Sequence, residues 1–241
     1  MAIADSLNTI AENVPKVYEA GRKKERDEFW DKYQNYGERV NYAGALAGSG
    51  WALTGLLPPK YNLKLKGANN YYVCAYFNNS AKERYDMTEI CKMFDTSELT
   101  RANSMFVNAK AENITVDISN CTYAIDMFNC GMGGGSIDKV YLKLSEKLTY
   151  ATSMFAYCYD LETLRFSSDS IIATNISLSS SSKLSKESII NVVNTLSTTA
   201  TDKTLTLNKT AIKNAFGADY DSSTEWTTLK NGKSNWTITL S

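Results

Sequence analysis

The chain of 241 residues contains no histidine. Histidine is the most common general base, a frequent zinc ligand and the side chain that titrates near neutral pH. Its absence excludes Ser-His-Asp and Cys-His catalysis. Lysine and arginine number 26, as do aspartate and glutamate, so the strongly basic surface typical of nucleic-acid-binding proteins is also missing. The composition therefore favours a protein that is not an enzyme, uses no cofactor or metal and binds no nucleic acid.

Long apolar runs are also absent. No stretch approaches the roughly 18 apolar residues of a transmembrane helix, so we expect no membrane span. The N-terminal residues, Met1–Leu7, lack a basic region followed by an apolar one, and we expect no secretory signal. The cysteines are odd in number and form no Cys-x-x-Cys unit, so we expect reduced core residues, while a disulfide between some of them stays open. They are Cys74, Cys91, Cys121, Cys130 and Cys158.

The N-terminal residues carry an apolar pattern with the alternating four- and three-residue steps of a heptad seam. Pro15 interrupts this pattern, because proline is tolerated in the first turn of a helix but not in its interior. We therefore predict two consecutive helices over residues 1–35, forming an anchor or coiled coil with a trimer as the favoured oligomer. The seam residues are Ile3, Leu7, Ile10, Val14 and Val17.

Phe29 and Trp30 close the second predicted helix and form an aromatic patch too large for an exposed face. This patch either docks the helix on its own chain or joins it to a larger assembly. The following residues, 36–62, are rich in glycine and contain Pro58-Pro59, which predicts a connector.

The phrase Thr-x-Ala-x-x-Met-Phe recurs after this connector, at residues 100–106, 122–128 and 149–155. Each copy is followed by a short β-like run, at 114–118, 140–144 and 164–166. Val116, Val140 and Leu164 are numbered 24 apart, and a repeat at such a period indicates stacked supersecondary units. The phrases would form the core of this stack, with one phenylalanine ladder made of Phe106, Phe128 and Phe155.

Alternate strand residues point to opposite faces of a sheet. We therefore expect one set to point inward: Val116, Ile118, Val140, Leu142, Leu144, Leu164 and Phe166. The outward set supplies a candidate protein- or glycan-binding face made of Asp117, Tyr141, Lys143 and Arg165. Asp117, Tyr141 and Arg165 are predicted to share a register and to lie side by side. The alternative interpretation of this face is an ordinary solvated sheet surface.

The C-terminal residues, 183–241, predict an α/β cap. Ser185 opens a helix whose apolar residues fall on one face. Further elements follow in the order strand, helix, helical turn and closing strand, at residues 204–207, 209–216, near Trp226 and at 235–240.

The third phrase continues as Met154-Phe-Ala-Tyr-Cys158-Tyr-Asp-Leu161-Glu-Thr-Leu164. This pattern, Met-Phe-x-x-Cys-x-x-Leu-x-x-Leu, resembles the BspA-like type of leucine-rich repeat. The second copy departs from it in the glycine-rich residues 131–135, and the first has Ala109 where cysteine is usual. The resemblance covers residues 85–210. It implies an α+β fold in which a leucine-rich-repeat β-solenoid over residues 63–182 stands between the N-terminal helices and the C-terminal cap.

Both ends of the chain carry a second resemblance. Residues 3–21 and 29–34, together with 184–190, 204–207 and 226–240, are similar to repeat proteins encoded by phages and prophages of gut Firmicutes. This resemblance implies a virion protein of the tail, baseplate or another surface appendage, made in the bacterial cytoplasm. Its partners would be other virion proteins and a host cell-surface protein or glycan.

The sequence therefore favours a non-enzymatic phage virion protein that presents a binding face for host attachment. One alternative is a capsid or baseplate decoration that only bridges subunits. Another is a bacterial surface adhesin, which would need a signal peptide and a wall anchor. A cell-wall hydrolase would need paired carboxylates, although carboxylates at repeat turns are ordinarily solvated. Its candidates are Asp126, Asp138, Asp160 and Glu162.

Overall fold

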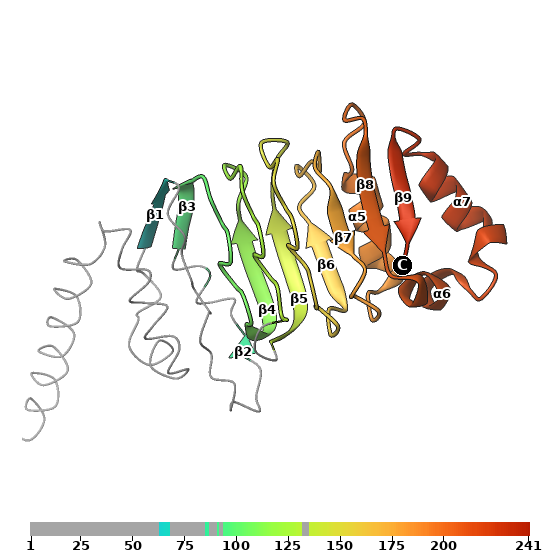
Figure 1. Cartoon of the computed structure of the whole chain (residues 1–241), viewed down its shortest axis with the longest axis horizontal. Helices are drawn as coiled ribbons and strands as arrows, with labels where there is room; N and C mark the ends of the chain where they lie inside the picture. The colour runs from blue at the N-terminus through green and yellow to red at the C-terminus, as the bar shows by residue number, and fades with distance from the viewer. Residues whose placement is uncertain (1–62, 68–84, 87–90, 92–93, 132–134) are drawn as a thin grey trace, which may run out of the picture. The chain divides into compact units, whose positions relative to one another are not determined.

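The computed structural model describes residues 63–67, 85–86, 91, 94–131 and 135–241 (Figure 1). All of these belong to one compact unit formed by residues 37–241. The predicted connector over residues 36–62 lies outside the described residues. So does the predicted N-terminal anchor, with Ile3, Leu7, Ile10, Val14, Val17, Phe29 and Trp30.

Every pair of strands in the described part of the chain is parallel. The strands form three sheets, in the orders β1-β3, β2-β4-β5-β6 and β7-β8-β9. Their bounds are β1 (Leu63–Gly67), β2 (Tyr85–Asp86), β3 (Phe94–Leu99), β4 (Lys110–Asp117), β5 (Ser136–Lys143), β6 (Thr163–Phe166), β7 (Ile176–Leu178), β8 (Lys203–Leu207) and β9 (Trp236–Leu240). The helices are α5 (Lys186–Thr195), α6 (Lys209–Phe216) and α7 (Thr224–Asn231), with a 3-10 turn, η1 (Tyr220–Ser222).

The predicted leucine-rich-repeat solenoid over residues 63–182 is wrong. The described chain is α+β, and its parallel strands form three separate small sheets instead of one continuous ladder. The central sheet ends at β6 because helix α5 takes the place of a next strand. The β6 amide of Leu164 donates to Ser188 Oγ at 3.1 Å, and that of Phe166 donates to Asn191 Oδ1 at 2.7 Å. Side chains of α5 thus accept hydrogen bonds from these amides at the edge of β6, in place of a further strand, and strand pairing stops there.

The three phrases form a ladder of backbone hydrogen bonds of their own. Phe106 N donates to Met127 O at 2.8 Å, and Phe128 N donates to Met154 O at 2.9 Å. The phenylalanine rings stack with centroids 5.5 Å apart between Phe106 and Phe128, and 5.2 Å apart between Phe128 and Phe155. All three rings are almost completely buried. The predicted phenylalanine ladder is therefore confirmed.

Each phrase also bends at the same position. The residue directly before the methionine has a left-handed backbone, with φ of 55° at Ser104, 54° at Asp126 and 56° at Ser153. This conformation costs an L-residue about 1–2 kcal/mol. Because all three phrases adopt it, they follow the same path and can stack on one another.

The equal spacing of 24 residues does not give the observed strand register. Ile114, not Val116, pairs with Val140, whereas Val140 pairs with Leu164 as expected. The offset is therefore 26 residues (114 to 140) from β4 to β5 and 24 (140 to 164) from β5 to β6. The longer offset spans the glycine-rich residues 131–135. A Cβ atom at Gly135 would lie 2.6 Å from the Cα of Asn108, so the chain can pass there only as glycine.

The predicted alternation along the strands is confirmed. Every side chain expected to point inward is buried, namely Val116, Ile118, Val140, Leu142, Leu144, Leu164 and Phe166. The outward positions between them are exposed or half-exposed.

The C-terminal elements also form as the sequence predicts. Ser185 is the N-cap of α5, and its side chain accepts a hydrogen bond from the backbone of Ser188. Strand β8, helix α6 and strand β9 occupy the expected stretches of the chain, and α7 is a longer helix than the helical turn predicted near Trp226. Asn208 and Ser223 cap α6 and α7 in the same way.

Replacing the central ring of the phenylalanine ladder should destabilise the fold. Phe128→Ala removes stacking on both sides and leaves a cavity, so we expect the free energy of unfolding to fall by about 3–5 kcal/mol. Chemical denaturation of the variant and of Lys230→Ala, at an exposed position of α7, measures the difference. A loss below about 1 kcal/mol for Phe128→Ala would show that the ladder does not hold the core.

Relieving the left-handed backbone should have the opposite effect. Ser153→Gly is expected to raise the free energy of unfolding by about 0.5–1 kcal/mol, because glycine adopts positive φ without steric cost. Thr152→Gly, at the preceding exposed position without positive φ, should instead lower it. Equal destabilisation by both variants in thermal or chemical unfolding would contradict the assignment of backbone strain to Ser153.

Candidate binding face

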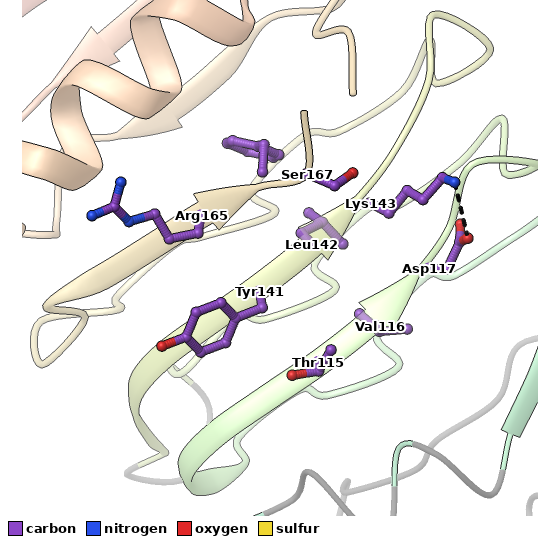
Figure 2. Close-up of a pocket in the computed structure, with 9 residues that line it drawn as sticks. Thr115, Val116, Asp117, Tyr141, Leu142, Lys143, Arg165 and Ser167 are labelled. Carbon is purple, nitrogen blue, oxygen red and sulfur yellow. Dashed lines mark ion pairs between the residues drawn. The ribbon is translucent and has the colours of Figure 1, made fainter. Parts of the chain in front are cut away.

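An open groove of about 290 Å³ runs over β4, β5 and β6 (Figure 2). It is lined by outward side chains of the three strands, by the inward residues Val116, Leu142 and Phe166, and by Ser167. Thr115, Tyr141 and Arg165 form one row across the three strands. Asp117 lies in the next row, opposite Lys143. The structure therefore places all four candidate residues on one face. The expectation that Asp117 lies in the row of Tyr141 and Arg165 is wrong, because the offset from β4 to β5 is two residues longer than the repeat suggested.

Lys143 is held between two carboxylates. Its Nζ lies 2.7 Å from Asp169 Oδ2, in the turn after β6, and 3.9 Å from Asp117 Oδ2. Hydrogen bonding to Asp169, with its charge and that of Asp117, raises the pKa of Lys143. The hydrogen bond from Lys143, followed by that from Ser167 Oγ at 2.7 Å, lowers the pKa of Asp169. These side chains are exposed, so the pairing contributes little stability, and its main effect is to orient Lys143.

Asp169 and Ser167 are site residues that the strand pattern did not identify. Both follow β6 in a turn whose bonds reach the neighbouring strand end. Ser167 Oγ lies 2.8 Å from Ser170 Oγ, and the latter accepts a hydrogen bond from the backbone of Leu144 at 3.2 Å. A Ser-x-Asp-Ser turn directly after a strand is the signal in the sequence that marks this corner.

Arg165 and Tyr141 occupy the other end of the face. Arg165 Nη1 donates to the backbone oxygen of Glu187 at 3.3 Å, which ties the arginine to helix α5. Tyr141 lies between Thr115 and Arg165 and leaves 40% of its surface exposed. The face thus combines one exposed ring with cations, carboxylates and hydroxyl groups, a mixture suited to binding a polar surface.

The phrases add a second row of surface side chains that sequence reasoning missed. The residue after each phrase threonine is Arg101, Tyr123 or Tyr150, and these positions pair through parallel bridges. The rings of Tyr123 and Tyr150 stack with centroids 4.7 Å apart, and the Arg101 guanidinium lies 4.9 Å from the Tyr123 ring centre. The variable position after the threonine of each phrase, which holds an arginine or a tyrosine, was therefore the signal in the sequence that could have predicted this stacked row.

The candidate carboxylates of a hydrolase lie at several places on the described chain. Asp126 accepts a hydrogen bond from Asn129 at 2.8 Å, and Asp160 accepts one from Lys183 at 2.8 Å. The backbones of Asp138 and Glu162 join through a hydrogen bond of 2.9 Å from Glu162 N. Among the residues that the structure describes, no group of three or more cysteine, aspartate and glutamate side chains is arranged to hold a metal ion.

The four described cysteines are buried and free, as expected from the sequence, while Cys74 lies outside the described residues. Burial, with a smaller effect of Asp117, raises the pKa of Cys121 to about 12. Cys158 Sγ lies 4.0 Å from Cys130 Sγ, and this hydrogen bond together with burial raises the pKa of Cys158. The raised pKa keeps Cys121 and Cys158 in the thiol form at neutral pH, whereas the thiolate is the nucleophilic form of cysteine.

No family model, curated protein or solved structure matches this chain. None of the helices in the described ranges combines the length and apolar content of a membrane span.

Removing Lys143 should release the carboxyl group of Asp169. In Lys143→Met we expect the pKa of Asp169 to rise toward its ordinary value of 3.8, measured by NMR titration of the carboxyl carbon. Lys139→Met, a change at an exposed lysine of the same strand, should leave that titration unchanged. An unchanged Asp169 titration in Lys143→Met would contradict the pairing.

The pKa shifts of Asp169 and Lys143 define the pH range in which their ion pair stabilises the fold. The contribution of Asp169 is present above the ordinary carboxyl value of 3.8 and is lost as the pH falls through its lowered pKa. The contribution of Lys143 is present below 10.5 and is lost as the pH rises through its raised pKa. The part of the stability difference between wild type and Lys143→Met that comes from the ion pair should therefore vanish at the acidic and alkaline extremes, as chemical denaturation at a series of pH values would show.

Proposed function

We propose that this protein is a non-enzymatic structural component of a phage virion and that the outward face of β4, β5 and β6 attaches the particle to its host. The observation that carries the attachment role is the exposed Tyr141 on the middle one of three paired strands, with Asp117, Lys143 and Arg165 on the same face. Tyrosine and arginine are over-represented among the residues that dominate binding energies. Side chains on paired strands lose little freedom when a ligand binds.

Two features of the face favour a polar ligand. Lys143 is oriented by Asp117 and Asp169, and Arg165 is tied to α5, so both cations are held before any ligand arrives. The groove between them is open and shallow enough to meet an extended surface. A cell-surface protein or glycan, which presents hydroxyl, amide and carboxylate groups, fits this arrangement.

The virion part of the proposal rests on the resemblance of the two chain ends to phage and prophage proteins. In that setting the chain is part of a tail, baseplate or other appendage, next to other virion proteins. The heptad spacing of its N-terminal residues supports assembly as an oligomer, with a trimer favoured. Mass spectrometry and immunogold labelling of purified particles test this part, and absence of the chain from particles would contradict it.

The attachment role is tested with intact cells. Fluorescently labelled wild-type protein should bind cells of at least one strain in a panel of gut Firmicutes, and Tyr141→Ala with Arg165→Ala should weaken binding about tenfold or more, as expected for central interface residues. Lys230→Ala, at an exposed position on α7, serves as the matched control. Equal binding by wild type and the double variant, or no binding to any strain in the panel, would contradict host attachment by this face.

The same variants separate attachment from decoration. If the face only bridges subunits, Tyr141 and Lys143 should be protected from surface labelling in assembled particles but reactive in the isolated protein. Host attachment instead requires that both remain reactive in the particle.

A further inference from the structure

Two tyrosine rings stand exposed at the end of the third phrase. Tyr157 leaves 50% of its surface exposed and Tyr159 leaves 58%. Their ring centres are 6.2 Å apart and the ring planes are inclined at 68°, so the two rings form a corner. Single exposed apolar side chains are ordinary, whereas these two large rings contact each other and present one surface of defined shape.

Hydrogen bonds fix the backbone of the corner in a conformation that is unfavourable for tyrosine. Tyr157 has a φ of 59°, in the left-handed region, which is rare for a bulky residue. Its amide donates to Ser180 Oγ at 3.1 Å, and its backbone oxygen accepts from Tyr159 N at 2.8 Å. Strain of this kind persists only where surrounding contacts enforce it.

A glycine makes room for the first ring. A Cβ atom at Gly131 would lie only 2.3 Å from Cδ2 of Tyr157 and 2.7 Å from its Cε2. The ring of Tyr157 therefore packs directly on the Gly131 backbone, and no larger residue fits there without moving it. Gly131, which follows the second phrase, thus fixes the position of the Tyr157 ring, which follows the third. The ring therefore has little conformational freedom to lose when a ligand binds.

Polar groups follow the corner directly in the chain. Asp160 follows Tyr159 directly and accepts hydrogen bonds from Ser136 Oγ and from Lys183 Nζ. Lys183 leaves 55% of its side chain exposed. Ser136 is the first residue of β5, whereas Lys143 is its last, so this corner and the Lys143 ion pair are at opposite ends of that strand.

We propose that Tyr157 and Tyr159 form a carbohydrate-binding subsite. The C–H groups on one face of a pyranose ring would pack on an exposed tyrosine ring, while sugar hydroxyls would bond to Lys183 and Asp160. A saccharide fits better than a protein partner, because only two rings are exposed here and charged groups border them, whereas protein hot spots lie within larger desolvated surfaces. This site needs no residue of the β4–β6 face and is independent of the attachment proposed there.

The test uses the full chain and two β-1,4-linked probes, cellohexaose and chitohexaose, whose sugar rings present flat faces of axial hydrogens. Isothermal titration calorimetry with probe concentrations up to about 10 mM covers weak binding. We expect at least one probe to bind, and Tyr159→Ala to raise its Kd about tenfold or more, consistent with the loss of one ring contact. Ile171→Ala, which removes another large apolar side chain that is 41% exposed, is the control and should keep the wild-type Kd.

A second variant tests whether weaker sugar binding could result from loss of the fold. Gly131→Ala leaves both tyrosines in the chain but displaces the Tyr157 ring, and it should weaken binding while circular dichroism stays unchanged. The proposal is overturned if neither hexasaccharide binds, if Tyr159→Ala binds as tightly as wild type, or if the corner binds a protein but no sugar. Tyr159→Ala tests the corner with sugar probes, whereas Tyr141→Ala with Arg165→Ala tests the β4–β6 face with intact cells, so failure here and failure of the attachment face are distinguishable.

Discussion

The stacked rings of Phe106, Phe128 and Phe155 are the interaction on which the central part of the structure depends. They are buried, nearly parallel and spaced by little more than 5 Å. Backbone hydrogen bonds between successive phrases hold the same segments together, so side-chain stacking and main-chain pairing enforce one another. A single phrase has neither a ring on both sides nor a partner for its amides, and several copies are needed before the arrangement is stable.

The binding face follows from this core. Each phrase delivers the chain to the next strand, so the phrase ladder sets which strand residues become neighbours. Between β4 and β5 the longer, glycine-rich connection places Tyr141 beside Thr115 and Lys143 beside Asp117. Helix α5 then closes the edge of β6 and fixes Arg165 through the backbone of Glu187. Gly135 is not part of the face, yet it affects which side chains of β4 and β5 lie side by side on it.

Part of this organisation could be predicted from local patterns. The phenylalanine ladder follows from a repeated phrase, the buried strand residues follow from period-two alternation, and helix α5 follows from its cap at Ser185. The continuous solenoid could not be excluded in advance, because an amide such as Leu164 N pairs equally well with a strand or with Ser188 Oγ. The strand pattern of the sequence shows that a backbone amide needs a hydrogen-bond acceptor, but it does not identify which acceptor the amide finds.

The candidate site was predicted by residue but not by arrangement. The four outward residues lie on one face, yet equal spacing put Asp117 in the wrong row, since the length of a glycine-rich connection does not fix register. Asp169 and Tyr157 were missed for related reasons. Their roles arise from a turn that reaches a neighbouring strand end and from a strained backbone, and neither has a periodic signal in the sequence.

Amide hydrogen exchange measured residue by residue by NMR tests the central claim most directly. If the phrases form the core ladder, the amides of Phe106, Ala124 and Phe128 should exchange as slowly as that of Val140 in β5, all opening only with the unit that contains them. Exchange of the phrase amides as fast as that of exposed turns, with Val140 still protected, would show that the strands hold together without the phrases and would contradict the account.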